Sequence, residues 1–390
     1  MLTTAQFENP GTFTVGEHLA ARGVSLPGSG PTHRKGFGRA RRPAAVCPVV
    51  RYAVGSVPVT MLVTRHNDEA RPNRAETAPY LTLLSELLDD FAPDQPIACN
   101  AHPMILEAMG RARRRGVTTS FAVRGFGYYD RRYFTDVEHV FTCSRYLTDH
   151  YREKVGLNST PIDPPIDWGT VVAPTETRAF VTFVHPALHK GLLLFARLAD
   201  MLGSRRPDIP VLVVQSGQSG GALNGIAGLD VSRYPQIMAA PPVPTPADYF
   251  ALTRLLLVPS VWPEPFGRVA AEAMINGVPP LVSDRGGLPD VVGGDFAQGG
   301  GRRVLPLPDW MTPERTRLPS EHEVAPWFDA VCALWDDAAL HGAVMARARA
   351  LAAERYSEER SRSTHVEFFT SRTPGDSAIT GAGATAPGGR

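Results

Sequence analysis

The stretch from Leu255 to Val292 constrains the fold of this chain more than any other segment. It opens with a short apolar run, Leu255–Pro259, which is typical of a strand buried on both faces of a parallel sheet. An alanine-rich segment with helical spacing follows, Gly267–Ile275, and then a second short apolar run, Val278–Ser283. A loop with two prolines and a glycine-rich turn come directly after these strands. The stretch therefore predicts strand, loop, helix, strand, loop, helix in an α/β fold.

Two glutamates of this stretch lie where such a fold binds ligands. Open α/β sheets bind ligands outside the carboxyl ends of their strands. Glu264 lies in the first loop and Glu272 lies eight positions further on, within the helix, so the two can contact separate parts of one elongated ligand. Carboxylates accept hydrogen bonds from sugar hydroxyls, and N–H groups at a helix start suit a diphosphate. The spacing alone is more often a solvated helix surface, and the proline and glycine residues around it favour the ligand-binding interpretation.

The whole stretch resembles the donor-binding half of the retaining glycosyltransferases of family 4, which have the GT-B fold. Their motif, with two glutamates eight positions apart and a later glycine pair, is matched here by Glu264, Phe266, Gly267, Glu272, Ala273, Gly277, Pro279, Gly286 and Gly287. Asp290 stands where the family normally has glutamate. The resemblance implies two Rossmann-like domains that face each other across a cleft.

The resemblance also implies roles for these residues. Glu264 would contact the transferred sugar or its phosphate, and Glu272 would hold the ribose hydroxyls of the nucleotide. Phe266 and Gly267 would offer backbone N–H groups to the sugar. Gly286 and Gly287 would belong to the same donor site, and so would Gly217, in the glycine-rich loop after another predicted strand.

Lys190 is the third candidate for the donor site. It lies in the turn between a predicted strand, Ala179–Val184, and a predicted helix, Leu192–Met201, where its charge can meet a phosphate. The family has lysine-glycine at this position and uses the lysine on the donor diphosphate. Many members also carry an arginine six residues earlier, where this chain has Val184 with His185 beside it.

This departure matters because valine cannot replace a guanidinium and histidine is largely neutral at pH 7. Two explanations remain open. Either Arg268 or Arg285 supplies the missing charge, or the affinity for the diphosphate is lower than is usual in the family.

Candidates in the amino-terminal half lie after predicted strands. His102 follows Ile97–Cys99, and the family has a histidine at a comparable strand end that approaches the transferred sugar. A structural role for a lone histidine is the alternative. Arg124, Phe126 and Tyr128 belong to a loop with glycines and aromatic rings that could form a wall of the acceptor site, and a packed loop is the alternative.

Length and composition indicate two domains. The chain has 390 residues, and proline clusters between Pro161 and Pro174 mark a stiff connection. We expect an amino-terminal domain over 1–167, a donor domain over 168–355, a helix over 356–372 that crosses back to the first domain, and a disordered tail over 373–390.

The net charge of +1 gives no attraction to nucleic acid. No apolar run reaches the ~20 residues of a membrane span, and contact with a membrane surface stays open. Four separated cysteines are expected to be reduced thiols, and the start of the chain does not resemble a signal peptide, so a cytoplasmic location is expected.

The leading hypothesis is a retaining glycosyltransferase that moves a sugar from a nucleotide-diphosphate-sugar donor to an acceptor nucleophile. Lys190 and helix N-termini would stabilise the departing diphosphate. No acidic metal-binding motif stands in a fitting loop, so neither a metal nor a cofactor is expected. The alternatives are a non-catalytic nucleotide-sugar-binding subunit and a sugar-nucleotide epimerase of GT-B fold. The sequence does not indicate the sugar, the base, the acceptor or the oligomeric state.

Overall fold

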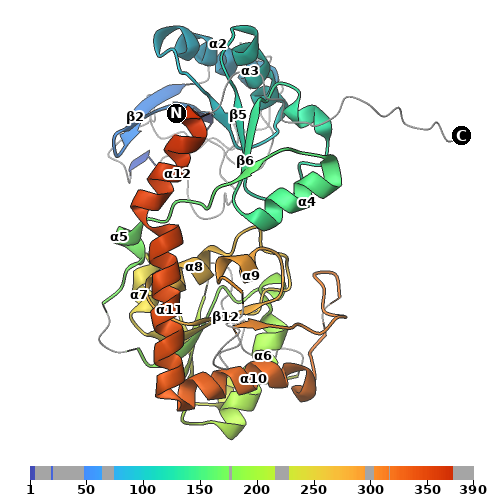
Figure 1. Cartoon of the computed structure of the whole chain (residues 1–390), viewed down its shortest axis with the longest axis vertical. Coiled ribbons are helices and arrows are strands. Elements are labelled where there is room, and N and C mark those ends of the chain that lie inside the picture. Colours follow the sequence, from blue (N-terminus) through green and yellow to red (C-terminus); the bar gives the residue numbers. More distant parts are fainter. Residues whose placement is uncertain are drawn as a thin grey trace, which may run out of the picture. The chain divides into compact units, whose positions relative to one another are not determined.

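The computed structural model describes residues 1–4, 19–20, 48–63, 74–174, 178–215, 228–294, 303–315 and 317–371 (Figure 1). Gly217 and the predicted tail over 373–390 lie outside these residues. The described chain divides into two compact units. The first comprises Met1–Phe121 with Arg131–His139, and the second comprises Ala122–Asp130 with Val140–Arg390. The predicted domain bounds at 167/168 and 355/356 stay a prediction.

The first unit contains a three-stranded sheet of order β1-β3-β2, in which β1 is Leu2–Thr4, β2 is Val49–Val54 and β3 is Val57–Leu62. The strands β1 and β3 pair in parallel, whereas β2 and β3 form an antiparallel hairpin. Gly55, with φ +59°, lies in the two-residue turn of this hairpin, where a positive φ matches the twist of the strands. A two-residue turn therefore joins these neighbouring antiparallel strands directly, with no helix between them.

The remaining elements of the first unit follow the predicted βα order. Helix α2 spans Arg74–Asp90, strand β4 spans Ile97–Ala98 and helix α3 spans Pro103–Arg114. Leu62 of β3 packs in one apolar cluster with residues of α2 and α3. A four-stranded sheet has the order β4-β5-β6-β7, in which β5 is Ser120–Val123, β6 is His139–Thr142 and β7 is Thr160–Pro161. Of these strands, β4 belongs to the first unit and β7 to the second, while the bounds of the units fall within β5 and β6. The pairs β4–β5 and β6–β7 are both parallel.

The second unit is built on a six-stranded parallel sheet of order β10-β9-β8-β11-β12-β13. Its strands are β8 (Phe180–Val184), β9 (Val211–Val214), β10 (Ile237–Ala240), β11 (Thr253–Val258), β12 (Pro280–Ser283) and β13 (Val304–Leu305). Its helices are α4 (Arg145–Val155), α5 (Trp168–Val171), α6 (Leu192–Arg205), α7 (Pro246–Phe250), α8 (Arg268–Ile275), α9 (Leu288–Val291), α10 (Glu321–Asp336), α11 (Ala338–Tyr356) and α12 (Glu358–Thr370). Its short 3-10 helices are η2 (Leu188–Lys190) and η3 (Val231–Arg233), whereas η1 (Arg131–Phe134) belongs to the first unit.

The order of elements predicted for the stretch from Leu255 to Val292 is confirmed by β11, α8, β12 and α9. All residues from Leu255 to Val258 are buried, and successive side chains of a strand face opposite sides of the sheet, so both faces of β11 are covered. Helices α6 and α10 pack together over the main apolar core, while α8 contacts β11, β12 and α11 (Figure 1). The sequence did not predict β10 and β13, both of which are short strands towards the edges of the sheet.

Gly191 determines how closely α6 approaches β11. It has φ +87° and ends η2, and a Cβ atom at this residue would lie 1.9 Å from the backbone oxygen of Pro259. This contact places Lys190, the preceding residue, beside the residues that follow β11. Only glycine permits both the positive φ and the close approach without strain.

We expect Gly191→Ala to destabilise the protein more than Gly228→Ala. Gly228 has a nearly identical φ of +86°, but a Cβ atom there would meet nothing within 4 Å. The backbone strain is shared by both variants, so the difference between their free energies of unfolding reports the clash of the new Cβ atom with Pro259. We expect this difference to be about 1–3 kcal/mol. Urea unfolding measures it, and equal stability of the two variants would show that Pro259 moves aside without cost.

Candidate functional site

A cavity of about 390 Å³ opens at the carboxyl ends of β8 and β11 in the second unit. Its position agrees with the general location of ligand sites in open α/β sheets. The lining residues come from the ends of these two strands, the following loops and helices α7 and α8: Phe183, Val184, His185, Lys190, Tyr249, Leu257, Val258, Ser260, Glu264, Gly267, Arg268, Val269 and Glu272. Glu264, Glu272 and Lys190 therefore share one cavity.

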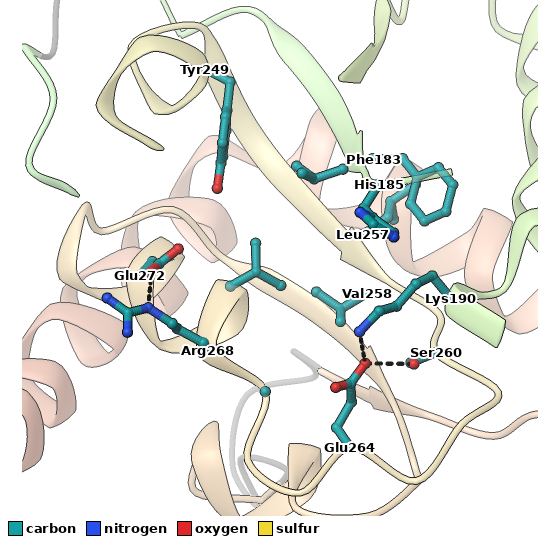
Figure 2. A pocket seen from close by; sticks show the side chains of 13 residues that line it. Phe183, His185, Lys190, Tyr249, Leu257, Val258, Ser260, Glu264, Arg268 and Glu272 are labelled. Atoms are coloured by element: carbon teal, nitrogen blue, oxygen red, sulfur yellow. Dashed lines mark hydrogen bonds and ion pairs between the residues drawn. The ribbon is translucent and has the colours of Figure 1, made fainter. Parts of the chain in front are cut away.

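Lys190 and Glu264 form an ion pair at one end of this cavity (Figure 2). Lys190 Nζ lies 2.6 Å from Glu264 Oε1, and Ser260 Oγ donates a hydrogen bond of 2.8 Å to the same oxygen. Only 12% of the Glu264 side chain is exposed, against 31% for Lys190. An ammonium group has three donors, so Lys190 can bind further acceptors while it holds Glu264.

Glu272 and Arg268 form a second pair, set apart from the first in the same cavity (Figure 2). Arg268 Nε lies 2.7 Å from Glu272 Oε1, one helical turn away on α8. The Glu272 side chain is 7% exposed, and burial raises the pKa of its carboxyl above the ordinary value, although Arg268 acts in the opposite direction. Arg268 stays 55% exposed and can turn towards a ligand.

The structure distinguishes between the two arginines expected to replace the missing cation. Arg268 lines the cavity, whereas Arg285 is not among the lining residues and pairs with Asp284 at 3.2 Å. Val184 lines the cavity where the resembled family has arginine, with His185 next to it. Burial, together with the charge of Lys190, lowers the pKa of His185, so this imidazole is neutral at pH 7 and adds no cation.

Gly286 and Gly287 support the loop that carries Glu264 and are not among the cavity residues. The N–H of Gly287 donates to the backbone oxygen of Glu264 at 2.7 Å. Gly286 has φ +61°, and a Cβ atom there would lie 2.4 Å from the backbone nitrogen of Glu264. These glycines thus fix the position of Glu264 through backbone contacts. The predicted contact of Gly286 and Gly287 with the donor stays a prediction.

Phe266 and Gly267 lie at the start of α8. Phe266 is buried and its ring packs edge-on against Tyr356, with ring centroids 5.9 Å apart, so only its backbone can serve a ligand. Gly267 caps α8 with φ +109° and lines the cavity. The first N–H groups of a helix have no partner within the helix, so the N-terminus of α8 directs unpaired donors towards this region.

Asp290 has a different environment from the two glutamates. It lies on α9, and its carboxylate is 3.8 Å from Arg355 Nη2, which is also 3.1 Å from Asp163. Arg355 additionally donates to the backbone oxygen of Asp290 at 2.6 Å. Asp290 does not line the cavity, so this substitution relative to the resembled family does not alter the cavity surface.

The residues predicted for the acceptor side belong to the loop Ala122–Asp130 of the second unit. The Phe126 ring contacts Trp262 edge-on at 5.8 Å between centroids, two residues before Glu264. The N–H of Tyr128 donates to Tyr151 Oη at 3.2 Å, and the backbone oxygen of Arg124 accepts from Cys143 at 3.7 Å. The backbone of this loop is therefore held by Tyr151 of α4 and by Cys143, which follows β6, while the Arg124 side chain is exposed.

His102 belongs to the first unit. It is the N-cap of α3, and its Nδ1 accepts a hydrogen bond from the N–H of Met104 at 3.2 Å. This is the structural role that was the alternative for a lone histidine at this position. Its predicted contact with a sugar stays a prediction.

Two cavity residues were missed at the level of sequence. The Ser260 hydroxyl donates to Glu264 and also lies 3.3 Å from the backbone oxygen of His189, and its place just after β11 was a usable signal. Tyr249 is buried on α7, and burial next to Glu272 raises the pKa of its hydroxyl. No sequence pattern indicated Tyr249, because α7 precedes β11 and only the packing of α7 directs the ring into the cavity.

Two family models match the carboxy-terminal part of the chain. Residues 172–299 match the model described as "Glycosyl transferases group 1", and residues 247–364 match "Family 4 Glycosyltransferase in conflict systems". The carboxy-terminal part of the chain is a family 4 glycosyltransferase domain. Lys190, Glu264 and Glu272 all lie within the matched segments.

A curated relative agrees with this assignment. The D-inositol 3-phosphate glycosyltransferase of Arthrobacter sp. (strain FB24) is 32% identical to the chain over 189 residues. The match covers 46% of this chain and 39% of the relative, so the chain spans well under half of the length of that protein.

Solved structures show the same fold. A glycosyltransferase from Rickettsia africae ESF-5 superimposes with a TM-score of 0.61 at 13% identity, over 80% of this chain and 85% of that chain. HepE from Anabaena, solved with UDP and glucose, has a TM-score of 0.59 at 15% identity, over 81% and 87% of the two chains. At this level of identity the likeness establishes the GT-B type of α/β fold. Among the described residues, no helix is both long and apolar enough to span a membrane.

Proposed function

We propose that this chain is a retaining glycosyltransferase that moves a sugar from a nucleotide-diphosphate-sugar donor to an acceptor nucleophile. One observation carries the proposal: Lys190, Glu264 and Glu272 line a single cavity at the carboxyl ends of parallel strands. The glycosyltransferase family models that match this part of the chain, and the curated glycosyltransferase that is similar to it, support the proposal.

The diphosphate would lie between Lys190 and the N-terminus of α8. As the bond to the sugar breaks, negative charge accumulates on the departing diphosphate. The ammonium of Lys190 has donors beyond the one used on Glu264, and the N–H groups after Gly267 add a positive dipole end. Arg268 lines the same cavity and would act as the second cation that Val184 does not provide.

The ribose would lie at the other end, against Glu272. Arg268 holds one carboxylate oxygen of Glu272, so the second oxygen can accept hydrogen bonds from a vicinal diol. The sugar to be transferred would then lie near Glu264. The separation of the two pairs within one cavity fits a ligand with a ribose at one end and a sugar phosphate at the other (Figure 2).

The acceptor would approach from the side of Phe126 and Trp262. Trp262 is 38% exposed and stands two residues before Glu264, so it presents an apolar ring face beside the proposed sugar position. Rings of this kind bind the apolar faces of sugars or cyclitols. We include Arg124 and Tyr128 in the proposed acceptor side as candidates.

A panel of nucleotide sugars tests the proposed function. UDP-sugars come first, because HepE was solved with UDP, and D-inositol 3-phosphate belongs among the acceptors, because it is named for the curated relative. We expect release of nucleotide diphosphate and formation of a glycosylated product with retained anomeric configuration. An EDTA control tests the expected metal independence, and unchanged rates would support it. A protein that neither binds nor turns over any donor would contradict the proposal.

A non-catalytic nucleotide-sugar-binding subunit is the second candidate. Val184 in place of an arginine, and the neutral His185 beside it, favour this candidate because the cavity has fewer permanent charges for a diphosphate. Calorimetry run alongside product detection separates the two candidates. Binding without turnover would support the subunit, and an altered free sugar nucleotide would instead indicate an epimerase.

A further inference from the structure

Another cavity, of about 290 Å³, lies at the opposite ends of the strands of the same sheet. It is lined by Arg178, Arg254, Gly277, His341 and Met345. Arg178 precedes β8, Arg254 is near the start of β11 and Gly277 precedes β12, so this cavity lies at the amino ends of three neighbouring parallel strands. A strand of six residues is ~20 Å long, which separates this cavity from the donor cavity at the carboxyl ends.

Two arginines, Arg178 and Arg254, line this cavity, and a third, Arg349, lies beside its residue Gly277. Arg349 lies across Gly277, because a Cβ atom at Gly277 would be 2.1 Å from Arg349 Nε. Among the residues that the structure describes, no carboxylate forms an ion pair with Arg178, Arg254 or Arg349. Burial and the neighbouring Arg349 both lower the pKa of Arg178. The cavity therefore holds positive charges that repel one another without a described counter-charge.

The guanidinium of Arg178 is also incompletely hydrogen-bonded. Its Nη1 donates to the backbone oxygen of Asn276, but its Nε is buried without an acceptor. Arg254 is better satisfied: it donates to the backbone oxygen of Trp335 at 3.1 Å and lies 4.4 Å above the ring centroid of Trp335. Buried donors are nearly always paired in folded proteins, so an unpaired buried guanidinium nitrogen is unusual.

We propose that this cavity binds a small phosphate-bearing anion. A phosphate presents several strong acceptor oxygens and up to two negative charges, and guanidinium groups match its geometry better than other side chains do. The volume exceeds that of an inorganic phosphate, so a small phosphate ester also fits. The site is independent of the proposed donor cavity, since it shares no lining residue with it.

The arrangement also gives the anion a contact with α8. Arg178 is bonded to Asn276, which caps the carboxyl end of α8, while Gly267 and Glu272 of the donor cavity lie at the start and on the body of the same helix. The Asn276 side chain in turn donates to the backbone oxygens of Val171 and Glu272. An anion that attracts Arg178 therefore acts, through the Arg178–Asn276 hydrogen bond, on the carboxyl end of α8.

Isothermal titration of inorganic phosphate into the full chain, in a chloride buffer, tests the proposal. We expect saturable binding that Arg178→Gln and Arg349→Gln each weaken by about tenfold, the effect of one charge-assisted hydrogen bond. Arg152→Gln, which removes an exposed arginine of α4, is the matched control and should bind phosphate as the unaltered chain does. Lys190→Gln reports on phosphate bound in the donor cavity, and should leave the binding at this second site intact.

The outcomes separate the alternatives. If Lys190→Gln removes all phosphate binding while Arg178→Gln and Arg349→Gln change nothing, the proposal is wrong. If Arg178→Gln fails to fold, Arg349→Gln decides alone, because its side chain is exposed. A parallel titration with glycerol 3-phosphate distinguishes the sources of the group: tighter binding indicates a phosphate ester, and weaker binding indicates the free ion.

Discussion

Replacement of Glu272 by glutamine is expected to weaken the binding of the nucleotide-sugar donor by about 10–100-fold, with a smaller effect on kcat. Hydrogen bonds to a charged group contribute about 1.5–3 kcal/mol each, and the ribose is not the reacting centre. Glutamine keeps the volume of this buried side chain but removes the charge and one acceptor. Calorimetry with the donor identified in the panel measures the change.

Two variants serve as controls for Glu272→Gln. Glu153→Gln changes a glutamate of α4 whose side chain is 76% exposed, and should leave donor affinity unchanged. Arg268→Gln keeps Glu272 but frees its carboxylate, and so shows how much of the effect passes through this ion pair. Unchanged donor affinity in a folded Glu272→Gln variant would remove Glu272 from the proposed site.

The dependence of donor affinity on pH should show the protonation of Glu272. Burial raises the pKa of Glu272, so this carboxyl takes up its proton at a higher pH than an exposed glutamate does. The protonated form loses acceptor capacity for the ribose hydroxyls. Donor affinity should therefore fall as the pH falls through this raised pKa, and Glu272→Gln should abolish that part of the profile.

Replacement of Lys190 by glutamine is expected to reduce kcat by about 10²–10³-fold, the usual effect of losing one preorganised charge at a developing anion. The ammonium lies 2.6 Å from Glu264, and among the described residues that line the cavity Arg268 is the other permanent cation. Steady-state kinetics with the identified donor and acceptor measure it. Lys154→Gln, an exposed lysine of α4, is the control and should retain full activity.

A double-mutant cycle with Glu264→Gln makes this prediction specific. Removal of Lys190 leaves Glu264 buried with Ser260 as its remaining partner, and an unpaired buried charge is itself destabilising. The double variant relieves that cost. If kcat recovers substantially in the double variant, Lys190 serves mainly to neutralise Glu264. If kcat stays low, Lys190 acts on the substrate, as proposed.

Much of the second unit could be predicted from local pattern. The apolar runs that became β8, β11 and β12 are short and bounded by glycine, proline or polar residues, and helix α8 ends at Asn276 and Gly277 as expected. Such elements depend on near neighbours in the chain, so a single sequence is sufficient to identify them. The strand β2 of the hairpin and the short strand β10 were not predicted, because pairing with an adjacent strand, and not periodicity, makes them strands.

The main charged residues of the candidate site could be predicted from the sequence, but the contacts between them could not. Placement after strands indicated Glu264, Glu272 and Lys190, whereas Tyr249 enters the cavity only through the packing of α7. The choice between Arg268 and Arg285 also could not be made from the sequence. Arg268 follows Gly267 and Arg285 precedes Gly286, so both lie next to glycines, and only side-chain packing directs one into the cavity and the other onto Asp284.

The sequence by itself determined the alternation of strands and helices in the carboxy-terminal part, and the residue types gathered at the strand ends. The tertiary structure decided which of them meet. Lys190 and Glu264 are 74 residues apart in the chain, and they pair because Gly191 lets α6 approach the end of β11. The same packing brings Arg178, Arg254 and Arg349 together at the other edge of the sheet, where no local pattern predicts a site. Local patterns record interactions between near neighbours, whereas binding sites depend on distances between residues that only the folded chain brings together.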